Sequence, residues 1–139
     1  MIILDTNVLS ALINAKPDPI ICDWLDALNA DSICITSVNL FECNYGIKLL
    51  EQGKKRSALE IAFDRFVSEF LNNRILHLDK LSAAASARLA AARKQAGRPV
   101  DIRDTFIAGI AIANRATVAT RNAKHFDEPE LHVINPWVG

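Results

Sequence analysis

The sequence predicts an α/β domain in which helices flank a central parallel sheet of four to five short strands. Short apolar runs such as Ile2–Leu4 do not alternate with polar residues, which is typical of parallel strands buried on both faces. Segments with apolar residues at helical spacing lie between these runs. Because the chain has 139 residues and is half hydrophobic, we expect residues 1–139 to form one domain.

The first strand ends at a polar triplet. Asp5 directly follows Ile2–Leu4, and Thr6 or Asn7 is expected to cap a helix that starts at Val8. Open α/β sheets bind ligands at the carboxyl ends of their strands, so Asp5 is a candidate functional residue. The alternative is that Asp5 is itself only a helix N-cap.

The second strand repeats this arrangement. Ser32–Thr36 is read as a short strand, and Thr36 or Ser37 as the N-cap of the helix that follows. Glu42 lies in the early turns of this helix, between apolar neighbours, and Gly53 is expected to end the helix. The structural alternative for Glu42 is a surface glutamate that compensates the helix dipole.

The remaining elements follow from the same patterns. Lys54-Lys55-Arg56 is interpreted as a solvated turn, and Lys124–Asp127 as a short turn or helix. Asp101 is expected to cap a helix that carries Asp104 three residues later. Further helices are expected over 20–28, 59–70 and 81–96, the last ended by Gly97, and further strands over 74–78, 117–120 and 131–134.

Composition excludes some classes of protein. No apolar run approaches the roughly 20 residues that cross a bilayer, and no signal peptide is visible, so we expect a cytoplasmic protein without a membrane partner. The three cysteines lack metal-ligand spacing and are expected to be reduced thiols. Sixteen basic and sixteen acidic residues cancel, so any polyanion must be bound by a local basic patch or through cations.

Four predicted strand-to-helix junctions carry an oxygen-bearing side chain. These are Asp5, Glu42, Asp104 and Asn122. Three carboxylates at one sheet edge would repel one another, and a divalent cation would remove that conflict. Oxygen ligands suit Mg²⁺ or Mn²⁺, and a metal-polarised water can attack a phosphodiester. The pattern therefore predicts metal-dependent phosphodiester hydrolysis.

Several short motifs follow one another in a specific order. They are Leu4-Asp5-Thr6-Asn7-Val8, Thr36-Ser37 ahead of Glu42, Gly46, Gly97-Arg98-Pro99 before Asp104, Ile107-Ala108, Thr120-Arg121-Asn122 with Phe126, and Ile134-Asn135-Pro136-Trp137. In this order they resemble the PIN-domain ribonucleases, and most closely the VapC-type toxins of bacterial toxin–antitoxin pairs in the FitB-like branch. The resemblance spans the whole chain.

The resemblance implies roles for several residues. Asp5, Glu42 and Asp104 correspond to the acidic, metal-binding catalytic triad. Thr6 corresponds to the hydroxyl that orients the first acid, with Asn7 beside it. The family often has a fourth acid after the fourth strand, but this chain has Asn122 there and His125 three residues later. Asn122 can still bind through its amide oxygen, and Asp101 is the candidate replacement for the missing charge.

The resemblance also implies partners. These are an RNA substrate, a second copy of the chain in a homodimer, and a cognate VapB-like antitoxin that blocks the acidic groove in a higher assembly. Arg103 and Arg121 are candidate phosphate contacts, whereas Lys48 is interpreted as ordinary solvated surface.

Two other functions are compatible with the same residues. A phosphatase with Asp5 as a covalent nucleophile would resemble enzymes that have a second aspartate two residues later, where this chain has Asn7. A catalytically silent protein-binding module on the same fold is the other alternative, because the fourth acid is missing.

Overall fold

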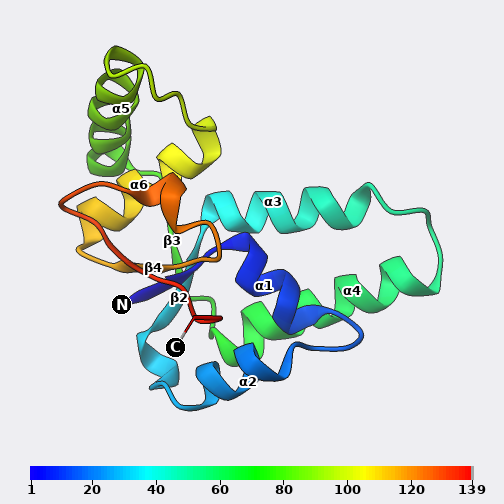
Figure 1. Ribbon diagram of the computed structural model, residues 1–139. Helices are drawn as coiled ribbons and strands as arrows, with labels where there is room; N and C mark the ends of the chain where they lie inside the picture. The colour runs from blue at the N-terminus through cyan, green and yellow to red at the C-terminus, as the bar shows by residue number, and fades with distance from the viewer. Residues whose placement is uncertain (139) are drawn as a thin grey trace.

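The computed structural model describes residues 1–138, and these contain five short strands that form one parallel sheet (Figure 1). The strands are β1 (Ile2–Leu4), β2 (Ile33–Thr36), β3 (Ile75–Leu76), β4 (Thr117–Ala119) and β5 (His132–Ile134). Their order across the sheet is β3-β2-β1-β4-β5, and every neighbouring pair is parallel. The predicted α/β class with a parallel sheet is confirmed.

Six α-helices within residues 1–138 surround this sheet. They are α1 (Thr6–Ile13), α2 (Pro19–Asp26), α3 (Ser37–Lys48), α4 (Lys54–Arg65), α5 (Lys80–Gln95) and α6 (Ile102–Asn114). Shorter helical segments are η1 (Ala30–Ser32), η2 (Phe66–Phe70) and η3 (Ala123–Phe126). None of the helices described here combines the length and the apolar composition that a membrane crossing needs.

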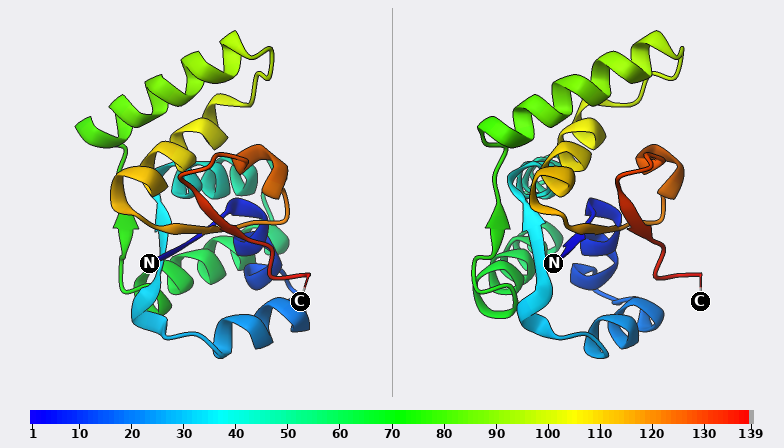
Figure 2. Two further views of the ribbon diagram at one scale, coloured as in Figure 1. Left: turned by 60° about the vertical axis from the view of Figure 1, so that its left-hand side comes forward. Right: turned by 90° about the vertical axis from the view of Figure 1, so that its left-hand side faces the viewer.

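The sheet is covered on both faces, which explains why its strands are apolar without alternation. Leu4 packs in a cluster with residues of α1, α2, α3 and α4, whereas Ile3, one position earlier, packs with residues of α5 and α6. Figure 2 shows α5 and α6 stacked together on one side of the sheet. Adjacent side chains of a strand point to opposite faces, so the single run Ile2–Leu4 contributes to both cores.

The turn between α3 and α4 differs from the sequence prediction. The prediction that Gly53 ends the helix carrying Glu42 is wrong: α3 ends at Lys48, and Gly53 directly precedes α4. The reading of 54–56 as a turn is also wrong, because these residues form the first turn of α4. Arg56 donates a 2.9 Å hydrogen bond to Glu60 one turn later, a pairing that favours helix over a solvated turn.

The cysteines agree with the expected reduced thiols. Cys22, Cys34 and Cys43 are all free, and the last two are buried. Burial raises the pKa of Cys34 to about 11 and that of Cys43 to about 12. Both side chains therefore serve as small apolar residues of the core.

Candidate metal centre

The sheet order creates a topological switch between β1 and β4. From β1 the chain builds outward to β2 and β3, then returns to the other side of β1 for β4 and β5. Connections on the two sides of such a point diverge and leave a crevice at the carboxyl ends of the strands, where open α/β sheets bind ligands. Asp5 follows β1 and Thr120 follows β4, so both residues lie at this crevice.

Asp5 is fixed by neutral hydrogen-bond donors. Its Oδ1 accepts a 2.8 Å hydrogen bond from the backbone N–H of Thr6, which makes Asp5 the N-cap of α1 in place of the expected Thr6 or Asn7. Its Oδ2 accepts a 2.7 Å hydrogen bond from the hydroxyl of Thr120 and a longer one from the Asn7 amide. Only 5% of Asp5 is exposed. The capping role and the functional candidacy are therefore compatible, because one carboxylate serves both.

Glu42 is oriented by Thr6. The Thr6 hydroxyl donates to Glu42 Oε1 at 2.9 Å. The family resemblance implied that this hydroxyl orients Asp5, but in the structure it orients Glu42. The amide of buried Asn39 donates to the same hydroxyl at 3.3 Å. Asn39 is itself fixed by a capping box with Thr36 at the start of α3. On its other side, Glu42 Oε2 lies 3.6 Å from the Arg103 guanidinium.

Asp104 lies in the first turn of α6, beside His125. Asp104 Oδ2 is 3.1 Å from His125 Nδ1. Asp101 caps the same helix, as predicted, by accepting a hydrogen bond from the backbone N–H of Arg103. The Arg103 side chain also makes a two-pronged contact with the Asp101 carboxylate, both distances being 3.1 Å. Asp101 is thus already paired and is a poor replacement for a missing metal ligand.

A buried arginine holds the segment that carries His125. Arg93 of α5 is 4% exposed and contacts the Glu128 carboxylate and the Thr105 hydroxyl, each at 2.9 Å. It also donates to the backbone carbonyl of His125 at 3.1 Å. Arg93 therefore ties η3 to α5 and α6, which places His125 beside Asp104.

The electrostatics distinguish the three predicted acids from Asp101. Burial raises the pKa of Asp5. Burial, together with the negative charges of Asp5 and Asp104, raises the pKa of Glu42. Burial and the charge of Asp5 likewise raise the pKa of Asp104, whereas hydrogen bonds from Arg103 lower the pKa of Asp101. Neighbouring negative charges therefore destabilise the ionised forms of Glu42 and Asp104, as expected for carboxylates that share a site.

One cavity of about 330 Å³ brings the three acids together. It is lined by Asp5, Thr6, Asn7, Ser10, Glu42, Asp101, Arg103, Asp104, Asn122 and His125. The predicted convergence of residues from distant parts of the chain is thus present in the structure.

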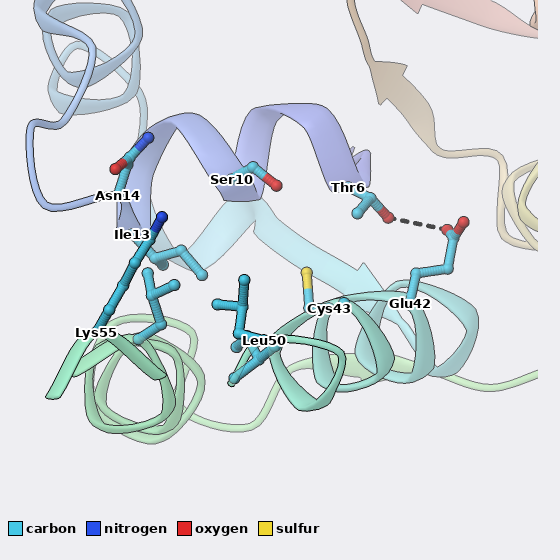
Figure 3. A pocket seen from close by; sticks show the side chains of 11 residues that line it. Thr6, Ser10, Ile13, Asn14, Glu42, Cys43, Leu50 and Lys55 are labelled. Carbon is cyan, nitrogen blue, oxygen red and sulfur yellow. Dashed lines mark hydrogen bonds between the residues drawn. The ribbon is translucent and has the colours of Figure 1, made fainter. Parts of the chain in front are cut away.

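A second cavity, of about 340 Å³, adjoins the first (Figure 3). The two share Thr6, Ser10 and Glu42, and Figure 3 shows the Thr6–Glu42 hydrogen bond at the shared end. Away from that end the walls come from α1, α3 and α4 and are mostly apolar, including Ile13, Cys43, Ile47, Leu50 and Leu59.

The residues of the first cavity fit a hard divalent cation by their chemistry. Carboxylate and amide oxygens are the donors that Mg²⁺ and Mn²⁺ take. Within residues 1–138, no three His, Cys, Asp or Glu side chains converge closely enough to enclose an ion by themselves. A cation here would therefore keep several water ligands, which is the usual coordination of Mg²⁺.

The other predicted residues are distributed unevenly around this cavity. Asn122 and Asn7 line it, and Arg103 stands at its edge between two carboxylates. Arg121 instead lies over the Trp137 ring, next to a different cavity, and Lys48 is exposed in the last turn of α3. Sequence reasoning missed Asn39 and Arg93, named Thr120 only as part of a family motif, and noted His125 only as a departure from the family.

Comparison with known families decides the classification. The PIN domain family matches residues 2–130. The chain belongs to the PIN-domain family. The five-stranded parallel sheet with its flanking helices is accordingly a PIN fold.

Several known proteins are similar to this chain along nearly their whole length. Plasmid stability protein StbB of Pseudomonas syringae is 37% identical, over 99% of both chains. VapC ribonuclease Y4jK of Sinorhizobium fredii is 33% identical, over 99% of this chain and 98% of the relative. Toxin FitB of Neisseria gonorrhoeae is 32% identical over 99% of both chains, and the crystal structure of FitAcB from the same organism has a TM-score of 0.89, at 32% identity and 99% coverage of each chain.

Proposed function

We propose that this PIN domain is a metal-dependent endoribonuclease that acts as the toxin of a VapBC-type toxin–antitoxin pair. The observation that carries the proposal is the set of three carboxylates, from the N-cap of α1 and from α3 and α6, that line one cavity and have raised pKa values. Similarity to proteins named VapC ribonuclease and Toxin FitB supports RNA as the substrate and toxicity as the outcome.

Asp5, Glu42 and Asp104 would hold the cation, Mg²⁺ or Mn²⁺. When bound, such a cation supplies a polarised water as nucleophile and neutralises charge on the phosphate. Asn122 would contribute at most a neutral oxygen, directly or through water. Because this chain has one negative charge fewer than relatives with a fourth acid, we expect one firmly bound cation rather than two.

The protein's own contribution is orientation. The Thr120 hydroxyl and the Thr6 backbone N–H fix the two oxygens of Asp5, and the Thr6 hydroxyl fixes Glu42. Neutral donors direct these carboxylates without cancelling their charge, so the charge remains available to a cation. Arg103, at the cavity edge, is positioned to exchange its carboxylate partners for a substrate phosphate.

An antitoxin would act by closing the same cavity. A VapB-like partner that inserts an arginine would pair bidentately with these carboxylates and compete with the cation. We infer a homodimer of the toxin, joined by antitoxin into a higher assembly, from the family resemblance and from the similarity to FitAcB.

The second candidate is the catalytically silent binding module. It is favoured by the contacts that already occupy two acids, namely Arg103 on Glu42 and His125 on Asp104. The two functions predict different responses to metal. A silent module would bind its protein partner without any increase in thermal stability on addition of Mn²⁺, whereas the nuclease would be stabilised by Mn²⁺.

Asp5→Asn tests the proposed function. Asparagine retains the oxygen that caps α1 but removes the charge, so RNA cleavage and growth arrest should be lost while the circular dichroism spectrum is unchanged. Asp23→Asn, an exposed position in α2, is the matched control and should remain toxic. An Asp5→Asn variant that cleaves RNA and arrests growth as the wild type does would refute the assignment.

A further inference from the structure

A third cavity, of about 760 Å³, opens beside the acidic one. The two cavities share Asn7 and Ser10, both on α1, so an extended chain could pass from one to the other over this helix. Beyond the shared residues, the walls of the third cavity come from the stretch between the last turn of α1 and the start of α2, and from Arg121 and Trp137. We refer to the part lined by Lys16, Asp18, Arg121 and Trp137 as the Arg121 groove.

The charge of the Arg121 groove is opposite to that of the acidic cavity. The acidic cavity has four carboxylates against the single guanidinium of Arg103. The Arg121 groove has the cations Lys16 and Arg121, and its one carboxylate, Asp18, accepts a 2.9 Å hydrogen bond from the Trp137 indole. Phosphates beside a scissile phosphate are repelled by the unneutralised acids and attracted to such a groove.

Arg121 is held ready for a ligand. Its guanidinium carbon lies 3.8 Å from the centre of the Trp137 ring, a cation–π contact that places the guanidinium over the indole. Its backbone N–H donates to the Asn7 side chain at 3.2 Å, and the Asn7 amide in turn reaches Asp5. None of the ion pairs within residues 1–138 involves Arg121. Arg121 helps to lower the pKa of Asp18 through its charge, but its exposed guanidinium makes no direct ion pair and can still bind a phosphate.

A guanidinium fixed in this way matches the chemistry of single-stranded RNA. Its N–H groups can donate to a phosphate, and its free face can stack on a base. The apolar cavity between α1, α3 and α4 suits RNA less well, because its walls are mostly aliphatic and include one cation, Lys55. Of the two cavities that adjoin the acids, the Arg121 groove is therefore the better site for a polyanion.

We propose that the Arg121 groove binds the single-stranded RNA that flanks the scissile phosphate, with one nucleotide contacting the guanidinium of Arg121 on its Trp137 platform. This inference rests on the proposed ribonuclease function and specifies where its substrate lies. Arg121 is then a substrate-binding residue, and Trp137 is a positioning residue that acts through Arg121.

The test measures binding of a labelled single-stranded RNA to the full chain, with Glu42→Gln in all variants to prevent cleavage. Arg121→Ala should weaken binding about tenfold and should reduce the slope of log affinity against log salt by about 0.7, the value for one lost phosphate contact in a single strand. Trp137→Phe should weaken binding less and leave the salt slope unchanged, because the charge and a ring remain. Arg88→Ala removes an equal charge from an exposed position on α5 and should change neither quantity.

Two results would overturn the inference. The first is an Arg121→Ala variant that binds RNA with the affinity and salt slope of the Arg88→Ala control. The second is an Arg121→Ala variant that no longer binds the antitoxin but still binds RNA, which would show that the groove binds a protein segment. The groove proposal and the proposed nuclease function can fail separately. If the wild-type protein cleaves RNA with metal but Arg121→Ala does not change RNA binding, only the groove proposal is refuted. If RNA binding depends on Arg121 but the wild-type protein does not cleave RNA, only the nuclease function is refuted.

Discussion

At the scale of single residues, the three acids are oriented mostly by groups that carry no charge. One hydroxyl, a backbone N–H and a side-chain amide donate to Asp5, and one hydroxyl donates to Glu42. The arginine that does reach Glu42, Arg103, lies at 3.6 Å, is 44% exposed and is shared with Asp101. An exposed, shared contact of this kind contributes little to stability. The negative charge of the cavity is thus largely uncompensated in the free subunit.

The His125 position should control how tightly the cation is held. Because His125 Nδ1 lies 3.1 Å from Asp104, His125→Asp places a fourth carboxylate next to the triad. The number of charged ligands sets the affinity of a divalent site, so we expect Mn²⁺ to bind about tenfold more tightly, measured by titration calorimetry. His125→Asn, which adds no charge, is the control and should not tighten binding. Equal Mn²⁺ affinities for the two variants would contradict this role of position 125.

The sequence revealed the acids but not the residues that orient them. Asp5 and Glu42 follow the strands β1 and β2, at junctions that local patterns can locate. The prediction of a strand-to-helix junction at Asp104 is wrong, because α6 follows α5 across a loop. Thr120 lies 115 positions from Asp5 in the chain and Asn39 lies 33 positions from Thr6. Their contacts depend on the register of β1 against β4 and on the placement of α3, and no local pattern encodes these. A single signal was available, since Thr120 is the last residue of a predicted strand and therefore lies at the same sheet edge as Asp5.

At the scale of elements, α5 and α6 approach each other closely at Gly109. A side-chain carbon added at Gly109 would lie 2.8 Å from the Ser82 carbonyl oxygen and 2.9 Å from the Ser86 backbone nitrogen. Both atoms belong to the backbone of α5 and cannot move alone. Glycine weakens the middle of a helix, so its presence in α6 needs a reason. The close approach of α5 gives that reason, since a larger residue would not fit.

Gly109→Ala should destabilise the protein by about 1–3 kcal/mol, the usual cost of overpacking, as measured by urea unfolding. Gly46→Ala in α3 is the matched control, because nothing lies within 4 Å of the added carbon. It should stabilise the protein by up to about 1 kcal/mol through helix propensity. A Gly109→Ala variant as stable as the Gly46→Ala variant would show that the two helices can separate without cost.

The elements themselves were largely predictable, with errors at their ends. All five strands and the helices between them follow from apolar patterns, and the strands β1, β2 and β4 at the centre of the sheet are largely buried. The α3–α4 turn was misplaced because Gly53 fits both the end of one helix and the start of the next. The charged residues after it resemble a turn until the Arg56–Glu60 pairing within α4 is known.

At the scale of the whole molecule, a chain without net charge concentrates negative charge in one cavity. The folded-state pKa values of Asp5, Glu42 and Asp104 are raised, so near these values the folded protein binds more protons than the unfolded chain. Linkage then requires that the contribution of these acids to stability falls as pH rises through that range. Without metal, the site should therefore weaken the fold at neutral pH.

Glu42→Gln should make the metal-free protein more stable than the wild type near pH 7, with the difference shrinking towards zero near pH 4, where Glu42 itself is largely protonated. The Thr6 hydroxyl can still donate to the glutamine oxygen, so the variant changes charge more than packing. Thermal unfolding of both proteins across this pH range, with chelator present, measures the effect. If the stability difference between Glu42→Gln and the wild type stays constant with pH, the difference arises from packing and not from charge.

The central claim is that the three acids work through a divalent cation. The most direct measurement is cleavage of single-stranded RNA by the antitoxin-free protein, first stripped of metal with a chelator and then supplied with Mn²⁺ or Mg²⁺. We predict no cleavage after stripping and full recovery when either ion is returned, with no recovery in the Asp5→Asn variant. Undiminished cleavage by the stripped protein would contradict the account.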